Sequence, residues 1–488
     1  MDNILSIKYF LPEIALIVTS LLILPLSLIF KTNVRKITIP FLTFGFIISF
    51  TFLIMNWDLS EHGLFFNLVA YDRFSQLFKL CLLIFTFFLL LISLNSSELK
   101  NISSKEYHFF IFILLLGSFL LVSSNNLLMI YISIETLSIA CLILVGYLKT
   151  NKSSNIAAVK NLFSSLLSSA ILIYGLSLVY GLTGTLNLPE IGHFLSNSSI
   201  NNFSITVIIL IILFGLGYKL TIVPFHIWSP DVYKGATTPI TAFLTTVPKV
   251  AGFAILIRVL ATTFSNANFT LVKYFHLSEI IAVLAAATMT LGNLLAINQK
   301  NIKGILAYSS IAHSGFILMG LAIFGQEGIS ASIFYLIMYS IAFIGVFTVV
   351  INSKTEFQLA NLKNHNTLNF QSSFSTIIIS IFLISLTGLP PTAGFVGKFY
   401  LFAALIKGGT KFYWLVIIGI INCIIMFFYH ARIIHSMLLY KNEKHIKYRY
   451  NKVLNVILIL LVIPTILFGI YWTPLFDFIK QSLHFFMP

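Results

Sequence analysis

Four charged residues stand in stretches that are otherwise almost wholly apolar. They are Glu135 in "LLMIYISIETLSIACLILVGYL", Lys219 in "LFGLGYKLTIVPFHIW", Lys249 in "TAFLTTVPKVAGFAILIRV" and Lys398 in "SLTGLPPTAGFVGKFYLF". A charge at the centre of a bilayer costs at least about 2.5–3.5 kcal/mol, so such groups either form static ion pairs or have a function. A buried amine without a partner also releases its proton more readily than an exposed one. Proton transfer is therefore the chemistry that these residues predict, and static pairing between packed helices is the alternative.

Proline residues accompany all three lysines. Pro224 follows the first lysine, Pro390-Pro391 precede the last, and Pro248 comes directly before the central one. Proline breaks or kinks a helix, and the backbone groups that it frees at membrane depth need water or polar side chains. Discontinuous helices at corresponding places are typical of transporters built from inverted repeats. We therefore expect broken helices at the first and last lysines and a third distorted site at Pro248.

Three further residues could extend a proton path. Lys160 lies in an apolar run, His226 follows the first proline break, and His313 lies in "GILAYSSIAHSGFILMGL" beside several hydroxyl side chains. A lone histidine on a helix is more often a packing residue. Hydroxyls one turn away on the same helix favour a hydrogen-bonded relay instead. The remaining cations within apolar runs, Lys79 and Arg258 together with Arg432, lie near the ends of those runs, where they are expected to reach the membrane interface.

The composition defines an integral membrane protein. The 488 residues are 58% hydrophobic and only 9% charged, against roughly 25% charged residues in soluble domains. The net charge of +15 does not indicate nucleic-acid binding, because the basic residues lie in short loops between apolar runs. The three cysteines lie in separate apolar stretches, and the sequence has no GxxxxGK[ST] motif. Neither electron transfer nor nucleotide hydrolysis is predicted for this chain, so its energy must come from a partner or an ion gradient.

The apolar runs predict transmembrane helices, since they lack the period-two alternation of barrel strands. A spanning helix needs about 20 residues, so the chain can hold about fourteen spans. We expect them at 11–30, 37–56, 74–94, 107–123, 126–148, 156–182, 204–224, 237–262, 276–297, 301–323, 329–351, 372–406, 413–438 and 453–472. The run 372–406 is too long for one straight crossing and should consist of two half-helices.

Basic residues concentrate in alternate loops of this arrangement. Because basic loops stay on the inner side of a membrane, the pattern places both termini on the outer face. The N-terminus lacks the basic region and the cleavage site of a secretory signal, so the first apolar run is expected to be a permanent helix.

Three segments carry a resemblance to a known family. "KLTIVPFHIWSPDVYKGATTPITAFLTTVPKVAGFAILIRV", "LAYSSIAHSGFILMGL" and "SLTGLPPTAGFVGKFYLF" are similar to the signature segments of the antiporter-like membrane subunits of proton-pumping NADH:quinone oxidoreductase, respiratory complex I. The resemblance implies an all-α fold of about fourteen transmembrane helices, with two inverted five-helix repeats and two discontinuous helices. The corresponding parts are N-terminal helices in 1–105, the repeats in 106–262 and 270–440, and a C-terminal loop with the last helix in 441–488.

The same resemblance implies roles for the charged residues. Glu135 would be the buried glutamate of the fifth helix and would form an ion pair with Lys219 of the broken seventh helix. Lys249 would be the central lysine of the eighth helix, and Lys398 the terminal lysine of the broken twelfth. The candidate relay residues along the connecting polar axis are Lys160, His226 and His313.

The function implied by the resemblance is proton translocation driven by redox chemistry in partner subunits. Those partners would carry NADH, FMN, iron–sulfur clusters and quinone, and this chain would hold no cofactor or metal itself. The expected partners are other membrane-arm subunits and the lipid bilayer. The alternatives are a subunit of a multisubunit cation/proton antiporter and a non-conducting structural subunit. High Phe, Ile, Asn and Lys usage resembles proteins of AT-rich genomes, which favours the mitochondrial inner membrane and leaves a bacterial plasma membrane open.

Overall fold

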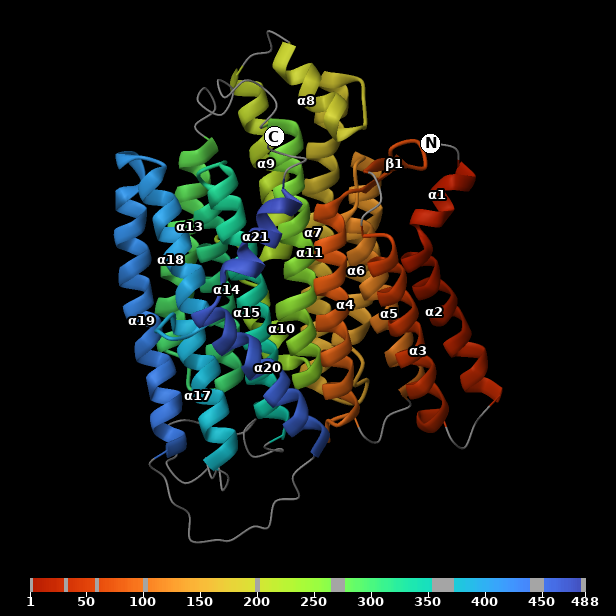
Figure 1. Cartoon of the computed structure of the whole chain (residues 1–488), viewed down its shortest axis with the longest axis vertical. Coiled ribbons are helices and arrows are strands. Elements are labelled where there is room, and N and C mark those ends of the chain that lie inside the picture. Colours follow the sequence, from red (N-terminus) through yellow and green to blue (C-terminus); the bar gives the residue numbers. More distant parts are fainter. Residues whose placement is uncertain are drawn as a thin grey trace.

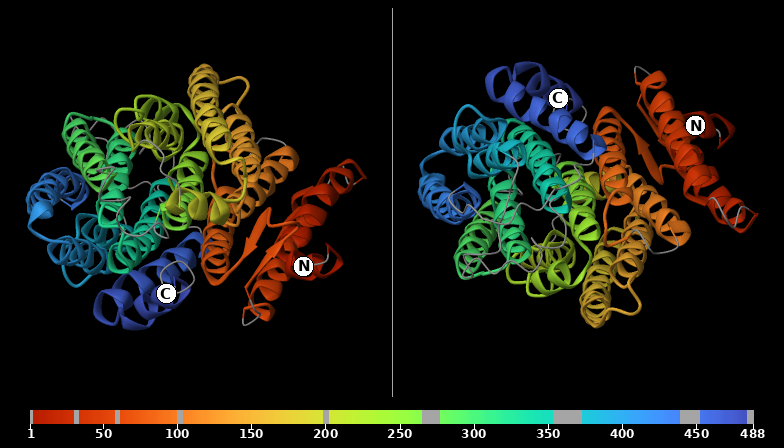
Figure 2. Two further views of the ribbon diagram at one scale, coloured as in Figure 1. Left: turned by 90° about the horizontal axis from the view of Figure 1, so that it is seen from above. Right: turned by 90° about the horizontal axis from the view of Figure 1, so that it is seen from below.

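The computed structural model of the chain describes residues 3–29, 34–57, 61–99, 104–197, 202–264, 277–352, 373–438 and 452–483. Within these ranges the regular structure is helical, apart from one two-stranded hairpin. The long helices run side by side in a bundle that is extended in one direction (Figures 1 and 2). This arrangement confirms the predicted class of a largely helical, polytopic membrane protein.

The predicted spans coincide with helices. Among the described residues, ten helices are long and apolar enough to cross a membrane, and four further helical stretches are apolar but shorter. Each of the fourteen predicted ranges overlaps one of these helices. The exact number of crossings and the inverted repeats stay predictions.

The N-terminal part forms one edge of the bundle (Figure 2). It consists of α1 (Asn3–Tyr9), α2 (Leu11–Ile29), α3 (Val34–Met55), β1 (His62–Leu64), β2 (Val69–Tyr71), α4 (Arg73–Leu94) and α5 (Ser104–Val122). The start of α4 is fixed by a capping box, in which the Asp72 side chain accepts from the Ser75 backbone N–H at 2.7 Å. The hairpin and α1 were not predicted, because their apolar stretches are too short to stand out.

The middle part holds the first broken helix. It consists of α6 (Leu127–Val145), α7 (Lys152–Thr183), α8 (Leu188–Asn197), α9 (Asn202–Leu220), α10 (Ser229–Gly235) and α11 (Thr238–Phe264). As predicted, the helix that contains Lys219 stops shortly before Pro224. Thr221, the first residue of the break, has a left-handed φ of 57°. The chain therefore leaves the axis of α9 before it enters α10.

The second broken helix lies in the C-terminal part. That part consists of α13 (Leu277–Ile297), α14 (Ile302–Leu321), α15 (Gln326–Asn352), α17 (Ser373–Thr387), α18 (Ala393–Lys407), η1 (Thr410–Phe412), α19 (Tyr413–Leu438), α20 (Lys452–Ile470) and α21 (Thr473–Ser482). The predicted run 372–406 is divided between α17 and α18, with Pro390-Pro391 in the interruption. The prediction of two half-helices is confirmed.

The third site, at Pro248, where a distortion was expected, does not interrupt its helix. Residue 248 lies inside α11, which continues without a break from Thr238 to Phe264. This helix is buried along its whole length by neighbouring helices. The Tyr339 hydroxyl of α15 donates to the Thr245 carbonyl at 3.0 Å, in the turn that precedes the proline. Packing and this hydrogen bond hold the helical path, so a proline in the sequence did not lead to a discontinuity.

Both terminal helices lie toward one end of the molecule, as expected. α1, β1, α8 and α21 are at this end (Figure 1). We call it the outer end, because the loop charges predict that both termini lie on the outer face. The orientation in the membrane stays a prediction.

The last long helix crosses the second break at very short range. A Cβ atom placed on Gly469 of α20 would lie 2.1 Å from the Pro391 carbonyl oxygen and 2.7 Å from the Thr392 carbonyl carbon. Only glycine allows this approach. Just beyond it, the Trp472 indole N–H donates to the Tyr400 hydroxyl of α18 at 2.7 Å. α20 is therefore packed directly on the interruption.

Candidate functional site

Glu135 and Lys219, the predicted pair, each bond to serine hydroxyls rather than to each other. The Lys219 ammonium donates to the hydroxyls of Ser138 on α6, at 2.5 Å, and Ser165 on α7, at 2.8 Å. The Glu135 carboxylate accepts from the Ser169 hydroxyl of α7. No ion pair joins the two charges, both of which are in the described part of the chain. The expected direct ion pair is therefore not formed in this structure, and each charge has serine hydroxyls as its partners instead.

Two of these serines, Ser165 and Ser169, come from one face of α7. Residues Ser164 and Ser165 are followed four positions later by Ser168 and Ser169, so the two pairs stack on the same side of the helix. The Ser168 hydroxyl donates to the Gly215 carbonyl of α9 at 2.8 Å, one turn before Lys219. These serines recur at a four-residue spacing within an apolar run of the sequence, and this local signal could have predicted the polar face of α7.

A small cavity of about 30 Å³ lies beside Lys219. It extends from the serine face of α7 to Pro248, which is the residue next to the central lysine. Its lining mixes apolar side chains with polar ones, among them Asn161, Ser164, Ser168 and Lys219. A cavity of this size has room for about one or two water molecules beside the Lys219 ammonium.

The first break is held by side chains from its neighbours. The Val223 backbone N–H donates to the Thr288 hydroxyl of α13 at 3.1 Å, and the Trp228 indole N–H donates to the Tyr218 carbonyl at 3.1 Å. The freed backbone groups are thus satisfied by polar side chains, as expected for a break at membrane depth. The nearby His226 is buried, and its Nδ1 has no hydrogen-bond partner among the described residues. The structure does not connect this histidine to the lysines by a direct contact.

Lys249 is completely buried in the centre of the bundle. Its ammonium donates to the Ser310 carbonyl at 2.6 Å and to the Ser314 hydroxyl at 3.0 Å, both on α14. No carboxylate pairs with it among the described residues. The neutral groups around it stabilise an ammonium less than a counter-ion would, so this lysine is well suited to lose a proton.

His313 lies next to the ligands of Lys249. It is fully buried on α14, and its Nδ1 shares a hydrogen bond of 2.6 Å with the Tyr335 hydroxyl of α15. Its Nε2 has no partner among the described residues. Because both partners of the lysine lie within one turn of His313, the structure brings these two predicted residues into one polar cluster.

Lys398 is buried at the second break. Its ammonium donates to the Thr387 carbonyl, the last of α17, at 2.9 Å, and lies 4.3 Å from the centre of the Phe316 ring. The same threonine shares a 3.1 Å hydrogen bond between its hydroxyl and Nδ1 of His430 on α19. His430 was missed from the sequence, because nothing in "MFFYHARIIHSM" distinguishes a buried histidine from a packing residue. The position of Lys398 confirms that the break exposes a carbonyl which a polar group must satisfy.

Gly388 makes the contact between Lys398 and the break possible. Its φ of 84° is in the region that favours glycine. A Cβ atom at this position would lie 2.7 Å from Cδ of Lys398. The glycine therefore provides both the turn and the space for the lysine side chain.

Lys160 lies apart from this buried set. It forms an ion pair with Asp231 of α10, and the two side chains are 48% and 53% exposed. An exposed pair of this kind contributes about 0–1 kcal/mol to stability. The structure therefore brings Lys249 and His313 together, places Lys219 and Lys398 at the breaks on either side, and leaves Lys160 on the surface.

Two cations that were expected to reach the interface are instead buried in ion pairs. Lys79 pairs with Glu13 of α2, and Arg258 of α11 pairs with Asp72. The four side chains are at most 5% exposed. The expectation failed because each acid comes from an element far away in the sequence. Arg432, the third such cation, is partly exposed and donates to the Ile297 carbonyl at the end of α13 at 2.8 Å.

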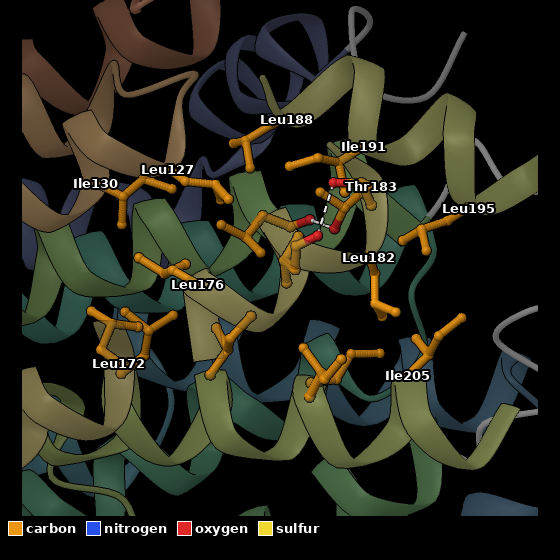
Figure 3. Close-up of a pocket in the computed structure, with 17 residues that line it drawn as sticks. Leu127, Ile130, Leu172, Leu176, Leu182, Thr183, Leu188, Ile191, Leu195 and Ile205 are labelled. Carbon is orange, nitrogen blue, oxygen red and sulfur yellow. Dashed lines mark hydrogen bonds between the residues drawn. The ribbon is translucent and has the colours of Figure 1, made fainter. Parts of the chain in front are cut away.

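A second cavity is apolar and lies outside the lysine set. It measures about 40 Å³ and is lined by aliphatic side chains of α6, α7, α8, α9 and α11 (Figure 3). Its two hydroxyls, of Thr183 and Thr263, donate to carbonyls of their own helices. It offers no group for proton transfer. Among the described residues, no group of three or more His, Cys, Asp or Glu side chains is arranged to hold a metal ion.

Comparisons with known proteins agree with this geometry. The family model of the NADH:quinone oxidoreductase/Mrp antiporter transmembrane region matches residues 124–425. NADH-quinone oxidoreductase subunit N 2 of Chloroherpeton thalassium is 38% identical over 481 residues, which are 97% of this chain and 94% of the relative. A chain of respiratory complex I from Thermus thermophilus with bound aureothin aligns with a TM-score of 0.78 and 25% identity, over 96% of this chain and 98% of that one. A chain of the Mrp complex from Dietzia sp. DQ12-45-1b aligns with a TM-score of 0.84 at 19% identity, over 100% and 98%, which shows a shared fold.

The chain therefore belongs to the NADH:quinone oxidoreductase/Mrp antiporter family of transmembrane subunits. The matched region contains Glu135 and the three buried lysines with both breaks. It begins after the end of α5, so the pairs made by Glu13 and Asp72 involve residues outside it.

Proposed function

We propose that this chain is a proton-translocating membrane-arm subunit of NADH:quinone oxidoreductase, respiratory complex I, of the kind named subunit N. The relative that is 38% identical over nearly the whole chain carries that name. The chain would be part of the enzyme without performing its redox chemistry. Its own task would be to move protons through the membrane.

The observation that carries this proposal is the environment of Lys249. A fully buried ammonium with only a carbonyl and a hydroxyl as partners would be a costly choice for a structural subunit. The lysine also lies between two broken helices, each with a lysine at the break. A non-conducting spacer would need none of these features.

The geometry supports an ordered transfer along the bundle. The serines around Lys219 both donate and accept hydrogen bonds, so they can exchange a proton with water in the adjoining cavity. A positive charge at Lys219 disfavours a second one at Lys249, because like charges repel and Lys249 has no counter-ion among the described residues. The proton from Lys249 would then move past His313 toward Lys398. Charge rearrangement that begins at Glu135 would drive the sequence.

The electron carriers would reside in partner subunits. NADH, FMN, iron–sulfur clusters and quinone are the groups implied for the assembled enzyme. The described part of this chain offers no set of side chains for an iron–sulfur cluster, since Cys81, Cys141 and Cys423 are all free and lie on three different helices. The partners would therefore be other membrane-arm subunits, packed along the apolar faces of the bundle.

A subunit of a cation/proton antiporter is the second candidate. The Mrp chain has the same fold at 19% identity, which supports the fold and not the activity. The two candidates differ in their companions. Mass spectrometry of the purified complex would find flavin and iron–sulfur subunits for the first function and only transmembrane subunits for the second.

Residue usage was a poor guide to which membrane contains the chain. The relative at 38% identity is bacterial, so we place the chain in a bacterial plasma membrane. The mitochondrial inner membrane, which residue usage favoured, has no support from the relatives named here.

Replacement of Lys249 by methionine tests the proposed function. Lys249→Met keeps the length of the side chain and removes the proton site. We expect the complex to assemble and proton pumping in reconstituted vesicles to fall about 100-fold, since a positioned acid–base group contributes about 10²–10⁴-fold. Lys152→Met, at an exposed position, is the control. Unchanged pumping by an assembled Lys249→Met complex would contradict the proposal.

A further inference from the structure

Two buried ion pairs lie close together in the N-terminal part of the molecule, and they are built differently. In the first, Arg258 donates to both carboxylate oxygens of Asp72, at 2.7 and 2.9 Å. The aspartate also accepts from the Ser75 N–H, and the arginine Nε donates to the Val122 carbonyl at 3.0 Å. Each charged group thus has several good hydrogen bonds. A pair of this kind keeps its charges and holds α4, α5 and α11 together.

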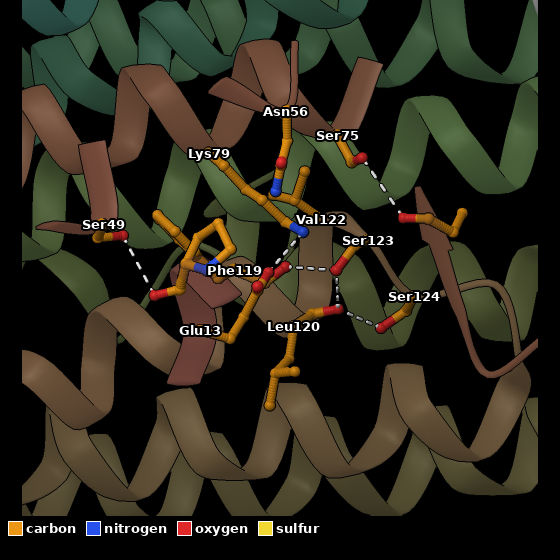
Figure 4. Close-up of polar contacts among 12 residues, drawn as sticks. Glu13, Ser49, Asn56, Ser75, Lys79, Phe119, Leu120, Val122, Ser123 and Ser124 are labelled. Carbon is orange, nitrogen blue, oxygen red and sulfur yellow. Dashed lines mark hydrogen bonds and ion pairs between the residues drawn. The ribbon is translucent and has the colours of Figure 1, made fainter. Parts of the chain in front are cut away.

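The second pair, Glu13 and Lys79, has almost no other support. The ammonium and the carboxylate are 2.5 Å apart, and the glutamate is completely buried. Apart from this lysine, neither carboxylate oxygen has a hydrogen-bond partner among the described residues. Figure 4 shows the two side chains pointing toward each other between α2, α4 and the end of α5. A carboxylate with one counter-ion and vacant acceptor positions is poorly stabilised in its charged form.

Polar groups lead from this pair toward the outer end. Gln76 lies one turn before Lys79 on α4, is buried, and has an unpartnered Oε1 among the described residues. The Tyr71 hydroxyl donates to the Asn56 carbonyl, and the Asn56 amide donates to the Lys8 carbonyl of α1 at 3.4 Å. These polar groups extend from α1 to Asn56, which lies beside Lys79 in Figure 4.

The charged and titratable groups around Glu13 are few. Lys79 faces it from α4, Tyr71 lies on β2, and the Tyr9 ring of α1 packs against that tyrosine with centroids 4.8 Å apart. Asp72 and Arg258, at the start of α4 and on α11, already satisfy each other, and Lys8 of α1 contributes a backbone carbonyl to Asn56. Lys79 is therefore the main electrostatic influence on the glutamate.

We propose that Glu13 and Lys79 form a second proton-binding site, separate from the set of Lys219, Lys249 and Lys398 and reached from the outer end. Uptake of a proton converts the carboxylate to a carboxylic acid and leaves the lysine charged, so the net charge of the site changes from zero to plus one. Release to the outer side restores the pair. The site lies outside the region matched by the family model.

Infrared difference spectroscopy of the membrane-embedded complex tests this site without relying on pumping. Spectra recorded across an acid-to-alkaline titration should contain a carboxylic acid C=O band that disappears in the double variant Glu13→Gln/Lys79→Met. This variant removes both charges, so no unpaired ion is left buried. The matched control is Asp72→Asn/Arg258→Met, in which the band should persist because that pair is not expected to titrate.

An unchanged difference spectrum would overturn the proposal. If the Glu13→Gln/Lys79→Met complex gives the same difference spectrum as the parent, the pair is only structural. Should that variant fail to assemble, Glu13→Asp provides the second test, because a shorter carboxylate moves away from the lysine. We expect its C=O band and its titration midpoint to shift, and an unshifted midpoint would reject the site.

Discussion

The two broken helices place their lysines on opposite sides of the interruption. Lys219 lies in the last turn before the first break, whereas Lys398 lies on α18, after the second. The first lysine is half-buried beside a small cavity, and the second is 2% exposed. The two sites are therefore not equivalent copies, although each combines a proline break with a lysine.

Their hydrogen-bond partners differ in kind. Lys219 donates to two serine hydroxyls, which can accept and pass on a proton. Lys398 donates to a backbone carbonyl, which only accepts. Titratable groups near it in the described part of the chain include the Cys423 thiol and His430, the latter reached through Thr387. The first break therefore favours exchange with water, whereas the second holds its lysine tightly and favours exchange through side chains.

The largest effect is expected from arginine at the tightly held site. Lys398→Arg keeps the positive charge, but guanidinium does not release its proton, so coupled pumping should fall about 100-fold. Lys398→Glu should recover part of the activity, because glutamate can also titrate. Proton transport and quinone reduction would be measured at matched assembly levels. Equal activity of Lys398→Arg and the parent would mean that only the charge matters.

A side chain at the second break should be nearly as harmful. Gly388→Ala forces alanine to a φ of 84° and places its Cβ against Lys398. The backbone strain alone costs about 1–3 kcal/mol, and the lysine must also move. Gly184→Ala is the matched control, with a φ of 69° and nothing within 4 Å of the added Cβ. Thermal stability and pumping should both fall further for Gly388→Ala, and equal losses would show that the contact with the lysine is unimportant.

Removing one hydroxyl at each break should show most clearly that the two lysine sites differ. Ser165→Ala deletes a partner of the Lys219 ammonium, and a hydrogen bond to a charged group is worth about 1.5–3 kcal/mol. We expect about a 10-fold loss of pumping. Thr387→Val leaves the carbonyl that binds Lys398 in place and should have a smaller effect. The opposite order of the two activities would refute the distinction between the sites.

The smallest effect is expected at the exposed pair. Lys160→Met breaks the contact with Asp231, but both side chains are about half exposed, so stability should change by about 0–1 kcal/mol. Pumping should stay within about twofold of the parent by the same argument. A large loss of pumping with normal assembly would return Lys160 to the proton path.

The breaks and the central lysines could be predicted because their signals are local. A charge or a proline within an apolar run is visible whatever the rest of the chain does, and the segments at Lys219 and Lys398 fold as expected. Helices were also predictable, because the run lengths match a bilayer. Pro248 shows that a proline alone does not predict a break, because the surrounding helices keep α11 continuous through it.

The partners of the charged residues could not be predicted, because they come from distant segments. Asp72 and Arg258 are separated by 186 positions, and no periodicity links them. Likewise, nothing local indicates that Glu135 would accept from Ser169 of α7 rather than pair with Lys219. Such pairings are decided by helix packing, which a single sequence does not reveal.

The close crossing of α20 over the second break has a mechanical consequence. With the glycine of α20 in contact with the Pro391 carbonyl, the break cannot widen or rotate unless α20 is displaced with it. α20 continues at once into α21, which packs against α15 and α4. The interruption is therefore stiffened by α20 and does not act as a free hinge. Any bending there is transmitted as a push along the C-terminal helices to the opposite, N-terminal side of the molecule.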